Sequence, residues 1–322
     1  MADEFGVTNL NSQNEGAAAP EALPPLGRSG FANIFLGPNG IRAGWRLLLF
    51  VIFFATIVFG IQFVLKHIPA LVAWQKAQDP HVMTPRGQII GEGIGVFALF
   101  MAAWLMSLIE KRTFADYYLP GREAFAKRFW QGVPYGFALL SLLLGIIAAL
   151  HGFSLGSLAV SGKAALQYGI LYAIGFIMVG IFEEFSFRGY MQSTLGSGIG
   201  FWPAAILLSI LFGAGHLNNI GEAWYGAAMA GSFGLLAAFS LSRTGNIWFP
   251  IGMHAGWDWG ETYFYSTPDS GFLAKGHMLN SSFHGPTWIT GGTVGPEGSA
   301  FVFLVLVIGA IGIHFMFPAR EV

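Results

Sequence analysis

Two adjacent glutamates, Glu183 and Glu184, lie within an apolar stretch that runs from Leu166 to Phe187. Placing one carboxylate at the centre of a membrane helix costs roughly 2.5–3.5 kcal/mol on insertion scales, so ionisable groups in such segments usually belong to a functional site. A carboxylate in these surroundings can act as a general base that takes a proton from water. The pair therefore indicates proton-transfer chemistry within the membrane.

The position of Arg188 predicts different roles for the two glutamates. Residues four apart lie on one face of an α-helix, so Glu184 and Arg188 can form an ion pair that offsets part of the cost of both charges. Glu183 points about 100° away from Glu184 and has no such partner on its own helix. We expect Glu184 and Arg188 to act as supports, or as a structural salt bridge, and Glu183 to carry the chemistry.

Glu183 and His216 are equally far along the chain, 16.5 residues each, from the midpoint between Ile199 and Gly200 in the turn at 196–200. Two antiparallel helices joined by that turn would bring both side chains to a similar depth. Gly213 and Gly215 would let a neighbouring helix or a substrate backbone approach His216 closely. We expect Glu183 and His216 to reach the same water molecule.

His254 and Asp258 form a further pair with helical spacing. A carboxylate at this position can set the tautomer of the imidazole or join a metal shell. The aromatic residues around them are typical of a belt at a membrane–water interface, namely Trp257, Trp259, Tyr263 and Tyr265. Sequence reasoning assigns no role to Glu92, Glu222 or Glu261.

The composition is that of a membrane protein with several spans. Of the 322 residues, 54% are hydrophobic and only 10% are charged, whereas a soluble domain carries about 25% charged residues. A net charge of −1 does not suggest nucleic-acid binding. Because the chain has no cysteine, a bound metal would need histidine and carboxylate ligands.

The hydropathy pattern predicts an all-α, polytopic transmembrane helical bundle with about eight spans, since about 20 apolar residues cross the hydrocarbon layer. Residues 1–40 are expected to be a disordered cytoplasmic tail, residues 41–322 the transmembrane domain, and residues 264–298 a loop without clear structure. The expected spans are 43–65, 89–109, 131–150, 166–195, 200–217, 221–242, 246–263 and 299–317.

The basic residues predict the orientation. With the N-terminus inside, most of the 16 Lys and Arg residues, including the block from Lys111 to Arg128, lie on the cytoplasmic side. We expect a multi-pass protein of the bacterial cytoplasmic (inner) membrane, with the N-terminus and the C-terminus in the cytoplasm.

Three motifs in order carry a resemblance to a known family: Glu183-Glu184-x-x-x-Arg188, Phe212-x-x-x-His216 and His254-x-x-x-Asp258. Together they resemble the CPBP family, which contains type II CAAX prenyl endopeptidases, Abi bacteriocin-processing or immunity proteins, and lysostaphin-resistance-A-like proteins. The similarity covers about residues 166–262. It implies an intramembrane endopeptidase with an all-helical catalytic core.

The resemblance implies a role for each motif residue. Glu183 looks like the base that activates water and His216 like its partner, while Glu184 and Arg188 look like supports. His254 and the position of Asp258 look like the group that stabilises the oxyanion. Type II CAAX proteases usually carry Asn at this last position, whereas many bacterial members of the family tolerate Asp. An ionised Asp cannot donate a hydrogen bond.

The resemblance leaves the cofactor open, because family members are described both as metalloproteases and as metal-free glutamate enzymes. With a divalent metal such as Zn, the ligands Glu183, His216 and His254 would leave one position for water. The implied partners are membrane lipid and a membrane-associated or lipidated peptide or protein. A bacterial source would argue against a prenylated substrate.

Two other functional classes fit parts of the sequence. Buried carboxylates and histidines also mark the proton relays of proton-coupled transporters, but these often have inverted repeats, and we see none in the sequence. A non-catalytic membrane scaffold or immunity protein predicts loss of motif residues, yet all three motifs are populated.

Overall fold

The computed structural model describes residues 30, 32–37, 40–80, 82–219 and 222–318. The chain divides into two compact units, Met1–Ile41 and Arg42–Val322. In the first unit, the short helix α1 (Ala32–Phe35) precedes an antiparallel pair of strands, β1 (Leu36–Gly37) and β2 (Gly40–Ile41). Most of the tail predicted at 1–40 lies outside the described residues.

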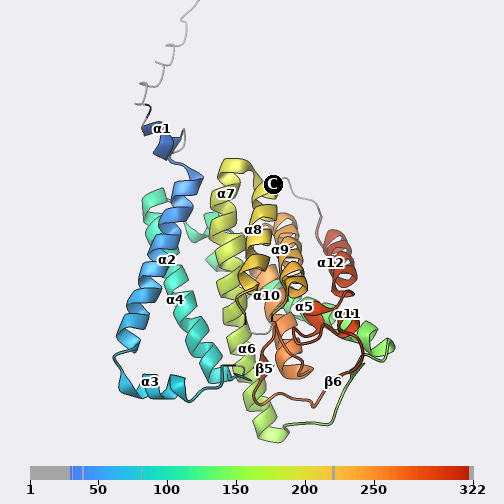
Figure 1. Cartoon of the computed structure of the whole chain (residues 1–322). Coiled ribbons are helices and arrows are strands. Elements are labelled where there is room, and N and C mark those ends of the chain that lie inside the picture. Colours follow the sequence, from blue (N-terminus) through green and yellow to red (C-terminus); the bar gives the residue numbers. More distant parts are fainter. Residues whose placement is uncertain (1–29, 31, 38–39, 81, 220–221, 319–322) are drawn as a thin grey trace, which may run out of the picture. The chain divides into compact units, whose positions relative to one another are not determined.

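The second unit is a helical bundle, so the all-α prediction is confirmed (Figure 1). A helical segment lies at each of the predicted spans. These are α2 (Ala43–Leu65), α4 (Pro85–Glu110), α5 (Lys127–Ala149), α6 (Gly162–Glu184) with the π-helical turn η3 (Phe185–Met191) and α7 (Gln192–Ile199), α8 (Phe201–His216), α9 (Trp224–Thr244), α10 (Trp248–Asp258) with the π-helical turn η4 (Trp259–Phe264), and α12 (Val302–Met316).

Short elements connect these helices. They are α3 (Pro69–Lys76), α11 (Thr287–Thr290) and the 3₁₀ turns η1 (Phe114–Tyr117), η2 (Gly121–Glu123) and η5 (Pro296–Gly298). Two pairs of two-residue strands join distant loops. They are β3 (Val82–Met83) with β5 (Leu273–Ala274), which are parallel, and β4 (Phe153–Ser154) with β6 (Ser282–Phe283), which are antiparallel.

Five helical segments in the described part of the chain are long and apolar enough to cross a membrane: α2, α4, α5, the continuous segment Gly162–Ile199, and α9. Helices α8 and α12 are apolar but shorter. At 1.5 Å per residue, the 16 residues of α8 reach about 24 Å, less than the ~30 Å hydrocarbon layer. The protein is a multi-pass membrane protein. Its shorter helices, such as α8, belong to the bundle but are not long enough to cross the membrane by themselves.

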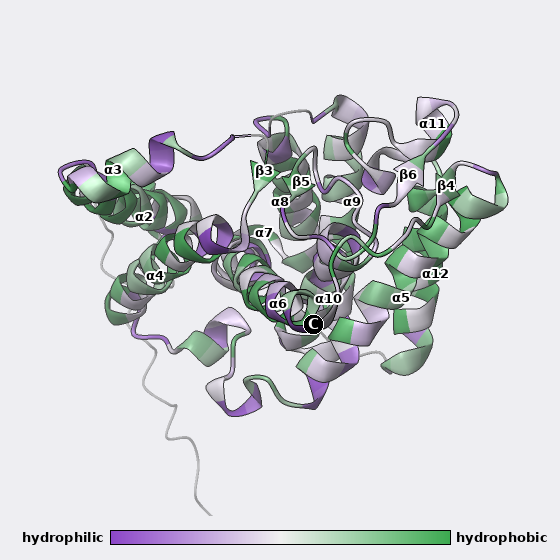
Figure 2. Ribbon diagram, turned by 90° about the horizontal axis from the view of Figure 1, so that it is seen from below, coloured by the Kyte–Doolittle hydropathy of each residue, from purple (hydrophilic) through white to green (hydrophobic). Residues whose placement is uncertain are grey.

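The outer helices expose apolar side chains. In α2 only Phe50 is buried, while Phe59 and Phe63 are 73% and 60% exposed. Helix α12 likewise exposes Phe303, Val307 and Phe315, and α2 is coloured mainly as hydrophobic in Figure 2. Such large apolar surfaces are characteristic of contact with lipid rather than water.

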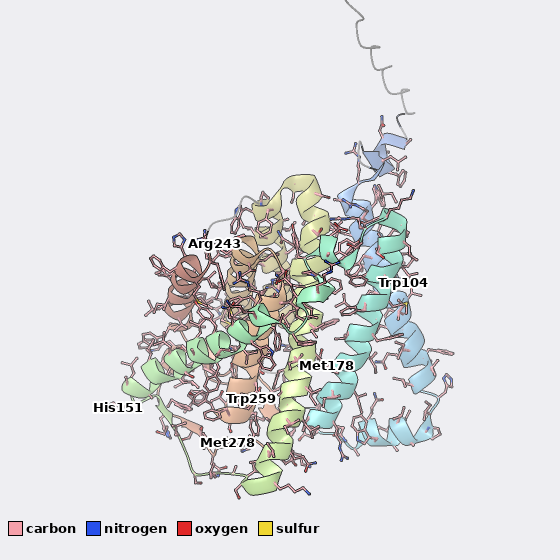
Figure 3. The ribbon with its side chains drawn as sticks, turned by 180° about the vertical axis from the view of Figure 1, so that it is seen from behind. Trp104, His151, Met178, Arg243, Trp259 and Met278 are labelled. Atoms are coloured by element: carbon pink, nitrogen blue, oxygen red, sulfur yellow. The ribbon has the colours of Figure 1, made fainter. Side chains whose placement is uncertain are left out.

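Helix α10 lies inside the bundle because glycines let α5 approach its backbone. A side chain at Gly252 would collide with the backbone carbonyl of Phe129, and one at Gly256 with that of Val133. Gly132 on α5 meets the backbone of α10 in the same way. This small-residue packing is typical of membrane helices. Figure 3 shows α5 crossing α10, with His151 just beyond the end of α5 and Trp259 just beyond α10.

The environment of α10 corrects the prediction of an interfacial aromatic belt. Trp257 and Tyr263 are only 1% and 4% exposed. The indole Nε1 of Trp257 donates a hydrogen bond to Glu261 Oε2 at 2.8 Å. The belt prediction was wrong for these two residues because neighbouring elements bury all eleven residues of α10, and they also bury Tyr263 in η4.

Residues 264–298 are more ordered than the sequence suggested. They contain β5, β6, α11 and η5, and the two strand pairs attach them to residues near α4 and α5. Backbone hydrogen bonds add to this attachment, among them Lys275 N to Met83 O and Ala159 N to Met278 O, both at 2.9 Å. This segment, which we call the 264–298 loop, forms part of the cavity described next.

Candidate active site

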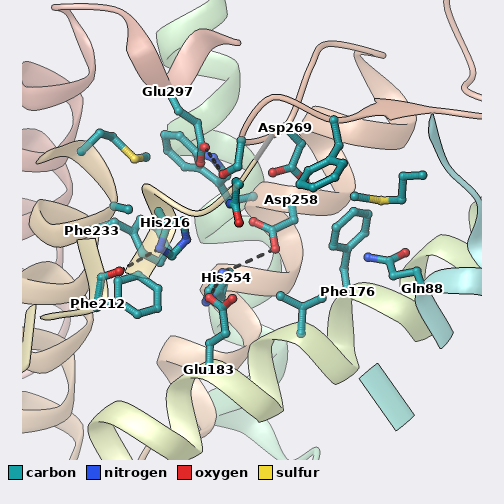
Figure 4. Close-up of a pocket in the computed structure, with 18 of the residues that line it drawn as sticks. Gln88, Phe176, Glu183, Phe212, His216, Phe233, His254, Asp258, Asp269 and Glu297 are labelled. Atoms are coloured by element: carbon teal, nitrogen blue, oxygen red, sulfur yellow. Dashed lines mark hydrogen bonds and ion pairs between the residues drawn. The ribbon is translucent and has the colours of Figure 1, made fainter. Parts of the chain in front are cut away.

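A cavity of about 320 Å³ brings together the motif residues of three helices (Figure 4). Glu183 comes from α6, His216 from the end of α8, and His254 and Asp258 from α10. The expectation that Glu183 and His216 face a common space agrees with this arrangement. The remaining two candidates, Glu184 and Arg188, are buried and do not line the cavity.

Glu184 and Arg188 form the ion pair that their spacing predicts. Arg188 Nη1 lies 3.4 Å from Glu184 Oε1, and the two residues are 2% and 0% exposed. Arg188 Nε donates to the carbonyl of Gly234 at 3.3 Å, and the guanidinium lies 4.2 Å from the centre of the Phe212 ring. A side chain at position 234 would collide with Arg188, so glycine there makes room for the guanidinium.

His254 is held between carboxylates on both sides of its ring. Its Nδ1 lies 2.8 Å from Glu184 Oε1, while its Nε2 lies 3.5 Å from both Glu183 Oε2 and Asp258 Oδ2. Ionised carboxylates only accept hydrogen bonds, and both imidazole nitrogens can donate at once only when the ring is protonated. The arrangement therefore favours the imidazolium form of His254.

His216 is oriented by the backbone of its own helix. Its Nδ1 lies 2.9 Å from the carbonyl oxygen of Phe212, which can only accept a hydrogen bond. The hydrogen of a neutral ring is therefore on Nδ1, which leaves Nε2 as the proton-accepting nitrogen. The Phe212 ring packs edge-on against His216 at 4.6 Å. Because Arg188 contacts the same Phe212 ring, the first two motifs support each other.

Sequence reasoning missed three carboxyl groups that line the cavity. Glu92 lies on α4, and Asp269 and Glu297 lie in the 264–298 loop. A carboxylate in a spanning helix was a usable signal for Glu92. The loop residues carry no periodicity that could have placed them.

The two loop carboxyl groups are fixed by hydroxyl donors. Thr262 Oγ1 donates to Asp269 Oδ2 at 2.6 Å, and Ser270 Oγ donates to Glu297 Oε2 at 2.9 Å. Burial raises the pKa of Asp269 to about 6. Burial, with the neighbouring charge of Asp269, raises the pKa of Glu297 to about 8. Both groups therefore change charge near neutral pH.

The three candidate metal ligands do not form a metal site as they lie. Among the described residues, no three His, Asp or Glu side chains are grouped to hold an ion. Both nitrogens of His254 face carboxylates, and Nδ1 of His216 faces a carbonyl. We therefore derive no chemical step through a metal.

The arrangement holds the parts needed to hydrolyse a carbonyl compound. Glu183 and Nε2 of His216 can accept protons beside the cavity, and Nε2 of His254 can donate a hydrogen bond into it. Such a combination of base and donor can activate a water molecule and stabilise the charge that develops on a carbonyl oxygen.

Comparison with known proteins connects this geometry to a family. Residues 165–260 match the family model described as type II CAAX prenyl endopeptidase Rce1-like. No curated protein matches the chain. The matched segment is less than a third of the 322 residues, begins in α6 and ends in η4, and so includes every candidate motif residue. The resemblance predicted from the three motifs is confirmed: over residues 165–260 this membrane protein is similar to the Rce1-like type II CAAX prenyl endopeptidases of the CPBP family.

Proposed function

We propose that the protein is an intramembrane endopeptidase that hydrolyses peptide bonds of membrane-associated protein or peptide substrates. The observation that carries this proposal is the shared cavity of Glu183, His216 and His254. The family match supports the reaction class, because it is a match to endopeptidases.

In the proposed reaction, a water molecule lies between Glu183 and His216. Glu183 accepts a proton as the water oxygen forms a bond to the carbonyl carbon, and His216 Nε2 orients the same water. The oxygen of the tetrahedral intermediate then accepts a hydrogen bond from His254 Nε2. Glu183 returns its proton to the leaving nitrogen as the carbon–nitrogen bond breaks. No other reactant is consumed.

Glu184 and Arg188 are positioning residues in this proposal. Glu184 accepts from His254 Nδ1, and Arg188 balances the charge of Glu184. The negative charge of Glu184 thus lies between the positive charges of Arg188 and His254. The imidazole is kept in place and protonated without direct contact between Arg188 and a substrate.

The proposal is tested with purified protein in liposomes and a quenched fluorescent peptide that carries a membrane anchor. We expect Glu183→Gln to lower the rate roughly 10²- to 10⁴-fold, as is typical when a general base is lost. Its melting temperature should change little, because the Glu183 side chain is 25% exposed. Asp79→Asn, an exposed carboxylate outside the cavity, is the control and should behave as wild type.

Two outcomes would overturn the proposal. Full function of Glu183→Gln in cells would favour a non-catalytic scaffold or immunity protein. Proton movement across the liposome membrane without peptide cleavage would favour a proton-coupled transporter. Elemental analysis of the purified protein, together with activity in the presence of a chelator, separates a metal-dependent from a glutamate-type mechanism.

A further inference from the structure

The cavity has a second wall that is acidic and lies outside the segment similar to endopeptidases. Asp269 and Glu297 of the 264–298 loop line it, and the matched segment ends at residue 260. Asp269 is 9% exposed and Glu297 is partly buried. The loop therefore adds two carboxyl groups to the cavity that the motif residues Glu183, His216 and His254 also line.

No Lys or Arg side chain balances the charge of this wall within the described lining of the cavity. The described residues that line the cavity include no Lys or Arg, and its basic groups are His216 and His254. His254 already faces the carboxylates of the catalytic motifs. By contrast, the hydrogen bonds that Asp269 and Glu297 accept from side chains come from neutral hydroxyl groups. A cation that enters the cavity would therefore compete only with the two imidazoles of the described lining for these carboxyl groups.

A third carboxyl group, that of Glu261, lies beside the backbone of the loop. It is wholly buried, and its Oε1 has no hydrogen-bond partner within the described residues. This oxygen lies beside the backbone of the loop, 3.2 Å from where a side chain on Gly295 would begin. The carboxylate interacts electrostatically with those of Glu297 and Asp269. Glu261 does not itself line the cavity, but its carboxyl group adds a third acidic group next to this wall.

We propose that Asp269 and Glu297 form a subsite that binds a Lys or Arg side chain of the peptide substrate, close to the scissile bond. This inference rests on the proposed function, since it places the subsite in the same cavity as Glu183 and His216. Lys and Arg have long stems and several N–H donors, which suits two carboxylates held at the far wall of a cavity of about 320 Å³. The substrates are thus peptides with a basic residue beside the cleaved bond.

The first experiment uses the wild-type protein in liposomes and changes only the substrate. In membrane-anchored peptides that differ at one position, Lys, Gln or Glu is placed in turn at each site flanking the cleaved bond. At one position we expect kcat/KM to be roughly tenfold or more higher for Lys than for Gln, because charge-assisted hydrogen bonds are worth more than neutral ones. The Glu peptide should be cleaved most slowly.

The second experiment assigns the selectivity to the two carboxylates. We expect the ratio of kcat/KM for the Lys and Gln peptides to fall toward one in Asp269→Asn/Glu297→Gln. Asp79→Asn should keep the wild-type ratio. If the double variant still cleaves the Gln peptide, the variant is folded. The melting temperature of the variant gives a second check of folding.

The outcomes distinguish this inference from the proposed function. A wild-type ratio near one at every position, or a preference for Lys that survives in the double variant, would overturn the subsite. Absence of any cleavage that depends on Glu183 would instead overturn the endopeptidase itself.

Discussion

His254 and Glu184 are joined by a hydrogen bond of 2.8 Å between Nδ1 and Oε1, which connects α10 to α6. On its other side Glu184 is paired with Arg188, which also holds the backbone of α9 through Gly234. The orientation of one imidazole therefore depends on three helices. Glu184 and Arg188 should therefore affect activity although neither lines the cavity.

We expect Glu184→Gln to lower kcat roughly 10²-fold with little change in KM, comparable to the loss of an oxyanion donor. The neutral amide no longer favours the protonated form of His254, so activity should decline at a lower pH on the alkaline side of the profile. A pH–rate profile of wild type and variant measures this shift, which a purely structural role would not produce.

Loss of Glu184 alone also leaves the buried charge of Arg188 unpaired, which costs about 3–5 kcal/mol in comparable cases. The double variant Glu184→Gln/Arg188→Met removes both charges and should recover much of the melting temperature. Its activity should stay low. Recovery of full kcat in the double variant would show that Glu184 matters only for folding.

We expect the protein to tolerate replacement of Asp258 by Asn, the residue that type II CAAX proteases usually carry at this position. An Asn side chain has the same shape, can still accept from His254, and can also donate to an oxyanion. We predict that Asp258→Asn keeps at least about a tenth of wild-type kcat/KM, whereas Asp258→Ala loses most of it, since one donor or orienting group can be worth about 10². Equal loss in both variants would mean that the negative charge itself is required.

The contact of α5 with α10 predicts a stability effect at Gly252, which does not line the cavity. A methyl group at Gly252 meets the backbone carbonyl of Phe129, which cannot turn aside as a side chain could. Overpacking of this kind typically costs 1–3 kcal/mol, so Gly252→Ala should melt at a lower temperature.

The matched control for this variant is Gly145→Ala, on α5 itself. A side chain there has no atom within 4 Å, and alanine favours a helix over glycine by up to about 1 kcal/mol. Gly145→Ala should melt at the wild-type temperature or slightly above it. Similar melting temperatures for the two variants would contradict the close helix packing.

The preference for a Lys peptide should depend on pH. Burial raises the pKa of Glu297 to about 8 and that of Asp269 to about 6, so both groups are largely neutral at about pH 5. They ionise as the pH rises, while a substrate Lys with a pKa near 10.4 stays charged. The ratio of kcat/KM for Lys and Gln peptides should therefore increase between about pH 5 and about pH 9.

Other ionisable groups surround this pair and could shift the curve without reversing its sign. They are Glu183, His216, Glu222, His254, Asp258 and Glu261. Asp269→Asn/Glu297→Gln is the control and should flatten the dependence of the ratio on pH. A ratio that rises equally in this variant would assign the effect to the surrounding groups.

The proposed orientation can be tested directly because the chain has no cysteine of its own. Arg122 precedes α5 and Lys163 follows it near the start of α6, and both are exposed. With both termini in the cytoplasm, a membrane-impermeant maleimide should label Lys163→Cys in intact cells. It should label Arg122→Cys only after the membrane is opened. The reverse pattern would invert the proposed topology.

Local spacing was the part of the site that the sequence could predict. The Glu184–Arg188 pair follows from four-residue spacing, and the common cavity of Glu183 and His216 agrees with their equal distance from one turn. The contact of His254 with both glutamates could not be predicted, because it depends on how closely Gly180 lets α6 approach α10.

Asp269 and Glu297 escaped sequence reasoning for a different reason. Two-residue strand pairs place the 264–298 loop against distant parts of the chain, and pairs this short leave no recognisable pattern. The sequence predicts a span at 246–263 that includes α10, although this stretch is short and contains Pro250 and four polar or ionisable groups. Its burial follows from the neighbours that cover it.

The complete enclosure of α10 also has a consequence for biogenesis. A segment of 11 residues that carries His254 and Asp258 is too short and too polar to enter the bilayer stably by itself. It becomes stable only once α5 covers its backbone and α6 supplies Glu184. His254 and Asp258 therefore reach their partners through helix packing, and insertion of α10 into lipid cannot by itself complete the candidate site.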